Sequence, residues 1–438
     1  MHRFRRCLVA CTAILISAGA SAYTSPPFPR LAVTWISNQT YAEPAIQSQL
    51  AHGDIAIILT WPGWTGNGAG IQPVLQNLKT MNPNLLVFEY IKNNETYGLP
   101  GSCGPWSALC NKLGAMNWYL YPTGGSGGPV PSTWPGSTSI NNTVFTRPDS
   151  NGDNWLNWFA KWAVSTYPST FDGFSVDNVF LKPRVNGDWN RDGVTDSDNS
   201  SQAAQWQQQG YVSFFSKLHS LMPGKFQIGN ISDWVQPGAV LTQYQGMVDG
   251  GVMEGMIGWS WSIETWGGWD AMMKGYRQAM AALGGPQIGI FAQVGSPTDY
   301  QSFRYGFASA LMGDAFYTFN TTTGGNGDWP WFDEYSYQHK FGAAVSSPPT
   351  TAWQNGVYRR DYENGIALVN PKGNGTQTVT LETNYTRITG TQAPSINNGQ
   401  TVRTLTLSDR DGIILLRNQP LPAAPAAVPA PPADITVQ

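Results

Sequence analysis

From residue 31 to about residue 320, the spacing of apolar residues alternates between one typical of strands and one typical of helices. Short alternating or continuous apolar runs predict strands, and segments such as Ile71–Met81, with apolar residues on one helical face, predict helices between them. Strands are expected at residues 31–35, 55–61, 85–90, 171–177, 226–230, 250–256, 287–293 and 315–320. This alternation predicts an α/β fold, a (β/α)8 TIM barrel over residues 28–346, with a doubly wound sheet as the alternative.

The pattern changes after about residue 347, where helical spacing disappears. Alternating apolar and polar positions predict strands near residues 357–362, 365–370, 376–381, 401–407 and 412–417, separated by Asn, Gly and Asp turns. We therefore expect a small antiparallel β-sandwich over residues 350–418. Residues 419–438 are rich in Pro and Ala, which is typical of an extended, disordered tail.

The first 22 residues have the features of a signal peptide. Arg3, Arg5 and Arg6 precede an apolar stretch, and Ala20-Ser-Ala22 resembles a cleavage site. An N-terminal membrane helix and a lipoprotein acceptor at Cys11 are the alternatives, but the apolar run is short for a span. We expect an exported protein, secreted or periplasmic, with no membrane span after cleavage.

Two cysteines remain after the predicted cleavage. Cys103 and Cys110 lie close together in a segment rich in Gly and Pro, so in an oxidising compartment they should form a small disulfide loop. Zinc is not expected, since the four His are scattered and no His or Cys pair has ligand spacing.

Composition narrows the class of partner. The formal net charge is −3 and no basic stripe is present, which argues against nucleic acid. Charged residues make up only 12% of the chain, whereas Trp occurs 19 times and Tyr 18 times. Trp offers a flat apolar face and one N–H donor, which suits a sugar ring, so a carbohydrate partner is favoured.

Two carboxylates stand at the ends of predicted strands. Asp177 ends the run Phe171-Asp-Gly-Phe-Ser-Val-Asp177, and Glu254 ends Gly250-Gly-Val-Met-Glu254. Barrel enzymes keep their chemistry at the carboxyl ends of the strands, and two acids there suggest acid–base work on a glycosidic bond. The neighbouring Gly251 and Gly255 would let a sugar approach Glu254. Alternatively, Asp177 caps the following helix and Glu254 is an internal ion-pair partner.

Other residues near strand ends are candidates for binding substrate. Aromatic residues there would be sugar platforms, or would pack beneath the barrel mouth; these are Trp35, Trp61, Tyr90, Trp234, Trp259 and Trp261. Three acids, Glu89, Asp233 and Asp314, would bind substrate or be structural, and Asp233 is the reserve member of the catalytic pair. A long excursion from about Asn93 to Gly152 is expected to be functional, because loops of this length are uncommon in compact domains.

The segment from Asp188 to Asn199 follows the spacing of a calcium-binding loop. Oxygen ligands would come from Asp188, Asn190, Asp192, the Val194 carbonyl and Asp196, with Gly193 at the sharp turn. The segment resembles the loops of dockerin and thrombospondin type-3 repeats, although Asn199 replaces the usual last acid. We expect a structural Ca²⁺ that stiffens the loop; the alternative is a solvated acidic loop.

Three stretches together resemble a known group of proteins. The Asp-Gly-Phe-Ser-Val-Asp-Asn strand, the Met253-Glu-Gly255 strand and the segment Asn364-Gly-Ile-Ala-Leu-Val-Asn-Pro371 are similar to glycoside-hydrolase-like TIM-barrel families. Their relatives include the endo-α-1,4-polygalactosaminidases and the α-galactosidase-type barrels. The resemblance covers roughly residues 28–418 and implies that Asp177 is the nucleophile and Glu254 the acid/base. The α-galactosidase type has Asp at the second position.

The hypothesis from the sequence is an exported glycoside hydrolase acting on a polysaccharide or oligosaccharide. A non-catalytic carbohydrate-binding barrel and a calcium-stabilised surface protein are the alternatives. The hydrolase requires the two acids to converge. A separation of about 5–5.5 Å indicates retention of anomeric configuration, and roughly 6.5–9.5 Å indicates inversion.

Overall fold

A computed structural model of the chain describes residues 23–66, 68–123, 126–321 and 327–419. The predicted signal peptide at residues 1–22 and nearly all of the predicted tail lie outside these ranges and remain predictions. Within them, no helix combines the length and apolar character needed to cross a bilayer.

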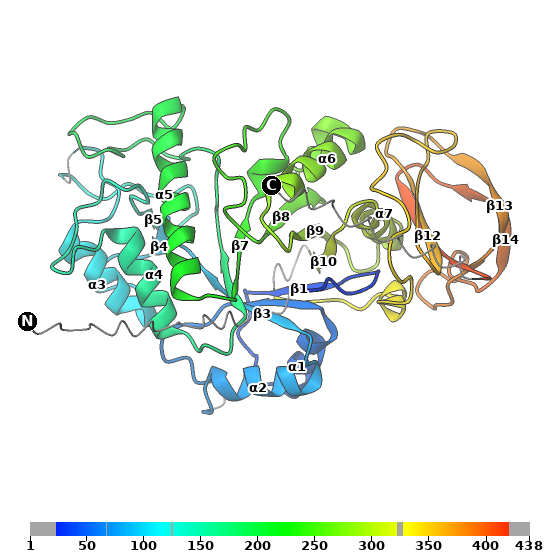
Figure 1. Ribbon diagram of the computed structural model, residues 1–438, viewed down its shortest axis with the longest axis horizontal. Helices are drawn as coiled ribbons and strands as arrows, with labels where there is room; N and C mark the ends of the chain where they lie inside the picture. The colour runs from blue at the N-terminus through cyan, green and yellow to red at the C-terminus, as the bar shows by residue number, and fades with distance from the viewer. Residues whose placement is uncertain (1–22, 67, 124–125, 322–326, 420–438) are drawn as a thin grey trace, which may run out of the picture.

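A barrel of eight parallel strands forms the centre of the molecule (Figure 1). Its strands follow chain order around the barrel: β1 (Ala32–Trp35), β2 (Ile55–Ile58), β3 (Leu86–Ile91), β6 (Gly173–Val176), β7 (Phe226–Asn230), β8 (Gly250–Ile257), β9 (Ile288–Gly295) and β10 (Phe316–Thr321). A parallel bridge between Leu31 and Tyr317 joins the two ends of the sheet, where the Tyr317 N–H donates to the Arg30 carbonyl at 3.0 Å. The predicted barrel is confirmed.

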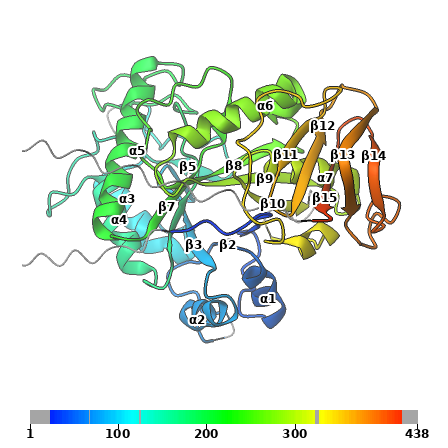
Figure 2. The same ribbon diagram turned by 45° about the vertical axis from the view of Figure 1, so that its right-hand side comes forward.

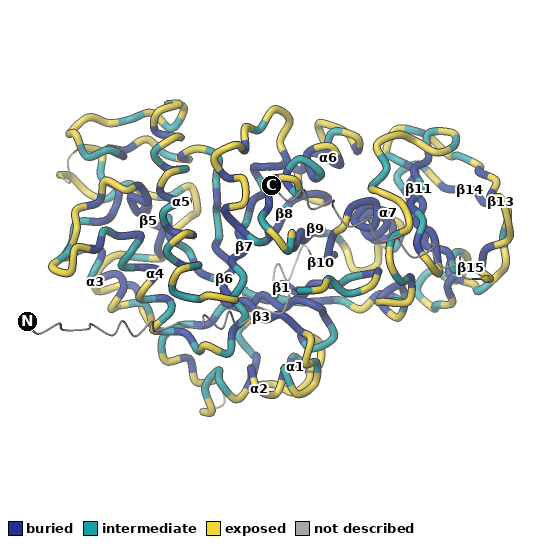
Figure 3. The backbone as a smooth tube through the Cα atoms, in the orientation of Figure 1, coloured by how far each residue is buried: buried dark blue, intermediate teal, exposed yellow. Residues whose placement is uncertain are grey.

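Helices lie between successive strands and cover the outside of the barrel. They are α1 (Pro44–His52), α2 (Ile71–Met81), α4 (Trp155–Thr166), α5 (Ser201–Leu221), α6 (Ile263–Ala282) and α7 (Tyr300–Leu311). The strands are buried and the outward helix faces are exposed (Figure 3). Continuous apolar runs in the strands are therefore explained by burial on both faces, toward the barrel interior and toward the helices.

Alternation along each strand separates two apolar cores. Ile55, Ile57 and Phe88 belong to the core inside the barrel, whereas Ala56, Ile58 and Val87 belong to the core between the strands and the helices. Successive side chains of a strand point to opposite faces, so the parity of a residue within its strand decides whether it can reach the barrel mouth.

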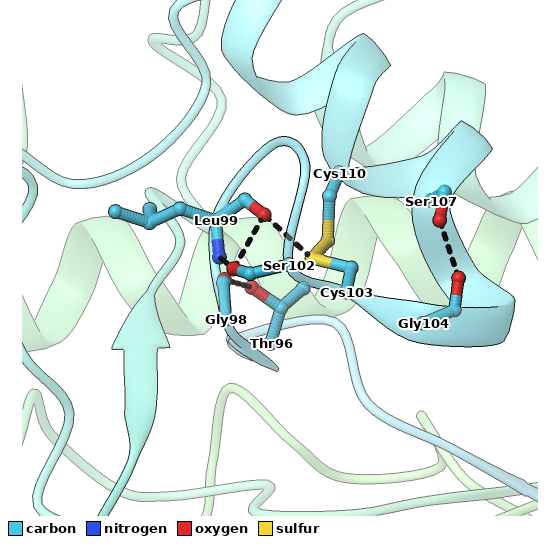
Figure 4. The surroundings of a disulfide bond; sticks show 8 residues. All are labelled: Thr96, Gly98, Leu99, Ser102, Cys103, Gly104, Ser107 and Cys110. Atoms are coloured by element: carbon cyan, nitrogen blue, oxygen red, sulfur yellow. Dashed lines mark hydrogen bonds between the residues drawn. A yellow bond between two sulfur atoms is a disulfide. The ribbon is translucent and has the colours of Figure 1, made fainter.

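The long excursion after β3 has structure of its own. It contains β4 (Glu95–Tyr97) paired antiparallel with β5 (Ser137–Ser139), the 3₁₀ helix η1 (Gly104–Trp106) and α3 (Ser107–Met116). Cys103 and Cys110 are joined by a disulfide, with their Cα atoms 6.3 Å apart, and this staples η1 to α3 (Figure 4). The predicted disulfide is confirmed.

Five antiparallel strands follow the barrel, and the antiparallel character predicted for this region is confirmed. They are β11 (Tyr358–Asp361), β12 (Gly365–Asn370), β13 (Gln377–Arg387), β14 (Thr401–Leu407) and β15 (Asp411–Arg417), hydrogen-bonded as one sheet in the order β11-β12-β15-β13-β14. One side of the sheet has an apolar cluster of its own, which includes Leu368 and Leu405. Strands β12 and β15 pack against α7 of the barrel (Figure 2).

A buried ion pair joins the sheet to the barrel. The Arg304 guanidinium on α7 bonds to both oxygens of Asp411 on β15, at 3.0 and 3.1 Å from Nη2, and both residues are buried. Next to it, a Cβ on Gly412 would lie 2.6 Å from the Arg304 carbonyl oxygen, so glycine permits the close approach of strand and helix. The two parts are therefore packed together rather than loosely linked.

Candidate active site

Asp177 and Glu254 converge at the carboxyl end of the barrel through a shared partner. Asp177 follows β6, Glu254 lies on β8, and the strand between them, β7, ends in Asn230. The Asn230 side-chain amide donates to Asp177 Oδ1 at 3.0 Å and to Glu254 Oε2 at 2.9 Å. Because both oxygens bond to one nitrogen, they are at most about 6 Å apart, the length of two such hydrogen bonds.

Local backbone geometry aims each acid at the mouth. The Asp177 N–H continues the ladder by donating to the Ile91 carbonyl at 2.8 Å, and the chain then turns at Asn178, which has a φ of 58°. On β8 the register shifts between Met253 and Ile257, and such a bulge re-aims the side chains within it. Both acids therefore sit where regular strand pairing stops.

The two glycines beside Glu254 allow close packing. A Cβ on Gly255, whose φ is 75°, would lie 2.1 Å from the Trp261 ring. A Cβ on Gly251 would lie 2.1 Å from the side chain of Ile231. Gly255 also lines the lateral cavity, so room for a sugar beside Glu254 stays a prediction there.

The surroundings of the two acids differ. Burial, followed by the nearby negative charge of Asp177, raises the pKa of Glu254, and the Asn230 hydrogen bond and Lys92 oppose this only in part. Asp177 instead accepts hydrogen bonds from the Tyr90 hydroxyl and from Asn230, and the Lys92 ammonium lies 3.9 Å away. These donors fix the orientation of the Asp177 side chain. The site thus places a carboxyl group with a raised pKa beside a carboxyl group that accepts several hydrogen bonds.

Lys92 connects the pair to the excursion. Its ammonium lies 2.9 Å from Glu95 Oε1 and 4.8 Å from the centre of the Tyr97 ring, both in β4. Burial opposes the charge of Lys92, but the charges of Asp177 and Glu95 outweigh it and raise the lysine pKa. The residue therefore remains a cation beside the acids.

Two cavities meet at the acids. The first, which we call the mouth cavity, has a volume of about 310 Å³; its lining includes Asp177, Glu254, Lys92, Tyr97, Trp134 and Asn320. The second, which we call the lateral cavity, has a volume of about 500 Å³; its lining includes Glu254, Arg184, Asp233, Trp261 and Trp266. Asn178, Asn230 and Glu254 line both. This open, two-part cleft has room for more than one sugar ring.

Comparison with known proteins identifies the class of enzyme. Residues 79–366 match the model of a family described as hypothetical glycosyl hydrolase family 15, which is more than half of the 438-residue chain. The chain belongs to this family. It is accordingly a glycosidase with a carbohydrate substrate, and the predicted resemblance to glycoside-hydrolase-like barrels is confirmed. No curated protein matches the chain.

The solved structures that resemble this chain share only its general architecture. An Anoxybacillus α-amylase is 11% identical with a TM-score of 0.48, covering 88% of this chain and 97% of its own. An α-amylase from Lactobacillus plantarum is 11% identical with a TM-score of 0.49, covering 89% and 98%. The glycoside hydrolase domain of PelA from Pseudomonas aeruginosa is 13% identical with a TM-score of 0.42, covering 68% and 97%. All three scores lie below 0.5, so no residue role or substrate is transferred from them.

Several predicted substrate-binding residues of this glycosidase reach the cleft. Tyr90 lines the mouth cavity, whereas Asp233 and Trp261 line the lateral cavity. Trp259 lies outside both linings but stacks on Trp261, with ring centres 5.7 Å apart and an interplanar angle of 14°. Asp233 is paired with Arg184 in the wall of the lateral cavity, and its reserve role in the catalytic pair stays a prediction.

Other predicted binding residues do not reach the cleft, and parity explains two of them. Glu89 is 0% exposed and Trp35 is 4% exposed, because both point away from the barrel interior; Glu89 accepts from the Thr60 N–H at 2.7 Å and from the Thr60 hydroxyl at 2.9 Å. Trp61 packs edge-on against Trp106 at 6.1 Å. Trp234 is buried and Asp314 pairs with Arg360. None of these five residues lines either cavity, so substrate contact by them stays a prediction without support from the cleft.

Several residues of the cleft were not predicted from the sequence. Lys92 could have been found, since it continues the inward parity of Leu86, Phe88 and Tyr90. Asn230 could also have been found, as the last residue of a predicted strand next to both acids. Tyr97 and Trp134 lie in the excursion, where no periodicity indicates which side chains turn inward.

The predicted calcium loop uses most of its side-chain oxygens internally. Asp188 accepts from the backbone N–H of Asp192 at 3.0 Å and of Gly193 at 2.9 Å, and Asp196 accepts from that of Trp189 at 3.0 Å. The remaining predicted ligands are Asn190, whose amide donates to Asp192 at 2.9 Å, and the carbonyl of exposed Val194. The Asn199 side-chain oxygen accepts a hydrogen bond from Lys182 at 2.6 Å.

Across the part of the chain that the structure describes, no three His, Cys, Asp or Glu side chains are grouped to hold a metal ion. Calcium therefore stays a prediction.

Proposed function

We propose that the protein is a retaining glycoside hydrolase, with Asp177 as nucleophile and Glu254 as acid/base. The observation that carries this proposal is the Asn230 amide bonded to both carboxylates. The resulting limit of about 6 Å allows the roughly 5–5.5 Å typical of retaining enzymes and is shorter than the roughly 6.5–9.5 Å of inverting enzymes. An inverting enzyme needs that extra space for a water molecule between acid and sugar.

The proposed reaction has two steps. In the first, an Asp177 oxygen attacks the anomeric carbon while Glu254 gives its proton to the glycosidic oxygen. The bond from the anomeric carbon to that oxygen breaks, the leaving sugar departs as an alcohol, and an ester links the remaining sugar to Asp177. In the second, the Glu254 carboxylate takes a proton from water, whose oxygen attacks the same carbon. The ester bond breaks, and both acids return to their starting states.

The surrounding residues support this division of roles. The raised pKa of Glu254 favours the protonated form, which can give its proton to the leaving oxygen. Tyr90 and Asn230 orient Asp177 from two sides, so that its ionised oxygen is positioned before substrate arrives. Burial, followed by the charge of Asp177, raises the pKa of the Tyr90 hydroxyl well above its ordinary value, so Tyr90 remains a hydrogen-bond donor.

Polysaccharide hydrolysis tests the proposal. We expect Asp177→Asn and Glu254→Gln to lose at least about 10³-fold in kcat while remaining folded, because each removes a group that acts in the transition state. Glu43→Gln, at the exposed residue that precedes α1 and lines neither cavity, is the matched control and should keep full activity. Full activity in either active-site variant would show that the pair is wrong.

Stereochemistry is tested separately. The first product seen by proton NMR should have the anomeric configuration of the substrate. A 2-deoxy-2-fluoro glycosyl fluoride should label the peptide that contains Asp177, and Asp177→Asn should abolish the label. Product of inverted configuration would contradict the nucleophile role while leaving a hydrolase in place.

We also propose that the protein is exported. The disulfide between Cys103 and Cys110 supports this, since structural disulfides persist in oxidising compartments. N-terminal sequencing of protein recovered outside the cytoplasm should begin just after Ala22. A mature chain that still begins at Met1 would contradict the proposal.

Calcium binding by the segment from Asp188 to Asn199 is proposed on its ligand spacing alone. No catalytic role is assigned to the ion. Isothermal titration with CaCl₂ should give a binding heat that Asp192→Asn reduces and MgCl₂ does not reproduce. The absence of any heat would leave the loop as a solvated acidic turn.

A further inference from the structure

The two acids divide the cleft unequally. Glu254 lines both the mouth cavity and the lateral cavity, whereas Asp177 lines only the mouth cavity. In a retaining reaction the nucleophile needs access only to the sugar that keeps the anomeric carbon. The acid must touch the oxygen between the two sugars, so it belongs at the boundary between their binding sites. The linings match this requirement.

We propose that the lateral cavity binds the leaving saccharide, on the reducing-end side of the bond that is cut. The mouth cavity then holds the sugar that becomes linked to Asp177. This inference rests on the proposed retaining function and adds a direction to the cleft. It makes the substrate a chain that crosses both cavities, so at least one sugar residue must lie on each side of the cleaved bond.

The lateral cavity offers aromatic surfaces of the kind that sugars pack on. Trp261 is 50% exposed and Trp266 is 57% exposed, although both line the cavity. The Trp266 indole N–H donates to the Trp261 carbonyl at 3.0 Å, and the Trp261 ring lies against Gly255 on one side and stacks on Trp259. Their orientation is therefore fixed before a ligand binds, which lowers the entropic cost of binding.

The polar wall of the lateral cavity indicates an uncharged ligand. Arg184 and Asp233 form an ion pair, and the Arg184 guanidinium lies 4.3 Å from the centre of the Phe180 ring. The Gln236 amide donates to Asp233 at 3.4 Å. The two charges of the pair cancel, while their remaining donor and acceptor positions suit hydroxyl groups. We therefore expect neutral sugar residues here in preference to uronic acids or free amino sugars.

A pair of substrates with the same reacting sugar separates the two cavities. The sugar is first identified from hydrolysis of a polysaccharide panel. The probes are then the corresponding glycosyl fluoride, whose leaving group is too small to use the lateral cavity, and a tetrasaccharide of the same linkage. For Trp266→Ala, we expect kcat/KM to fall about tenfold more for the tetrasaccharide than for the fluoride, because one sugar–aromatic contact is lost.

Trp134→Ala is the matched comparison in the mouth cavity, where Trp134 is also an exposed tryptophan. Trp134→Ala should lower kcat/KM by a similar factor for both probes. The fluoride reaction also reports whether each variant is folded.

Two results would overturn the inference. If Trp266→Ala lowers kcat/KM equally for both probes, the assignment of the lateral cavity is wrong, but the proposed hydrolase function is unaffected. If the wild-type protein hydrolyses no probe, the proposed function itself fails and the inference fails with it.

Discussion

At the scale of single residues, Asn230 is the group that makes a pair out of two separate acids. Its two N–H bonds are directed to different strands, so a single planar amide fixes the spacing of Asp177 and Glu254. A hydroxyl or a shorter side chain at this position could not donate to both acids at once.

The pH dependence of activity should respond to Lys92. The groups that face Glu254 are Asp177 after β6, Asn230 on β7, Tyr90 on β3 and Lys92 just after β3. The positive charge of Lys92 lowers the pKa of Glu254. In Lys92→Met this effect is lost, so the pKa of Glu254 rises further and the basic limb of kcat/KM should move to higher pH. Lys340→Met, at an exposed position, is the control. A basic limb that moves to lower pH would contradict the assignment of Glu254 as the acid.

Glu89 should make stability depend on pH. Burial raises its pKa well above the ordinary value of 4.5, so the folded protein holds the proton after the unfolded chain has lost it. In that window the wild-type protein loses up to about 1.4 kcal/mol of stability per pH unit as the pH rises, and below pH 4.5 the effect is absent.

Glu89→Gln removes this proton linkage and keeps the shape of the side chain. The free energy of unfolding of Glu89→Gln, measured by urea titration, should increase relative to that of the wild type as the pH rises above 4.5. Glu43→Gln should show no such trend. A parallel pH dependence of wild type and Glu89→Gln would show that the buried carboxyl is ionised in the folded protein.

At the scale of elements, sequence patterns predicted the strands better than the helix ends. Eight apolar runs became eight barrel strands because burial on both faces leaves an unambiguous signal. The sequence predicts that Asp153 caps the helix after it, but α4 is capped by Asn154, whose side chain accepts from the Asn157 N–H, and Asp153 pairs with Lys161. The apolar spacing predicts a helix over residues 269–283, but α6 begins earlier, at Ile263, and is kinked at Gly268. Such ends depend on tertiary partners that no local pattern contains.

The contact between α7 and β15 should depend on the buried ion pair. Asp411→Ala leaves the Arg304 charge buried without its carboxylate, so we expect a loss of about 3–5 kcal/mol in the free energy of unfolding. The double variant Arg304→Met with Asp411→Leu should recover part of the loss, because no charge remains to be buried. If the single and double variants are equally destabilised, packing rather than charge holds these elements together.

At the scale of the whole molecule, the sequence predicted the barrel, the antiparallel region and both acids, but not the shape of the cleft. The acids were visible because each ends a periodic strand. Part of the cleft lining, such as Tyr97, Trp134 and Trp266, comes from the excursion and from the first turn of α6, where strand periodicity does not indicate which side chains turn inward. Parity within strands, applied consistently, would have excluded Trp35 and Glu89 and included Lys92.

The barrel and the C-terminal sheet should unfold together. Besides the Arg304–Asp411 pair, Arg360 of β11 donates to the Leu311 carbonyl at 3.1 Å and to Asp314 at 2.8 Å, which satisfies backbone at the end of α7. Differential scanning calorimetry should therefore show a single transition for these two parts. Two separated transitions would mean that each has a stable core without the other.

The order of strands in the C-terminal sheet has a consequence for folding of the chain. Strand β15 follows the other four strands of the sheet along the chain, yet it lies in the middle of the sheet, between β12 and β13, and it brings Asp411 to Arg304. Until residues 411–417 are in place, the sheet has a gap at its centre and the arginine on α7 lacks its partner. The packed contact between the barrel helix and the sheet can therefore form only after all the other strands of the sheet have become available.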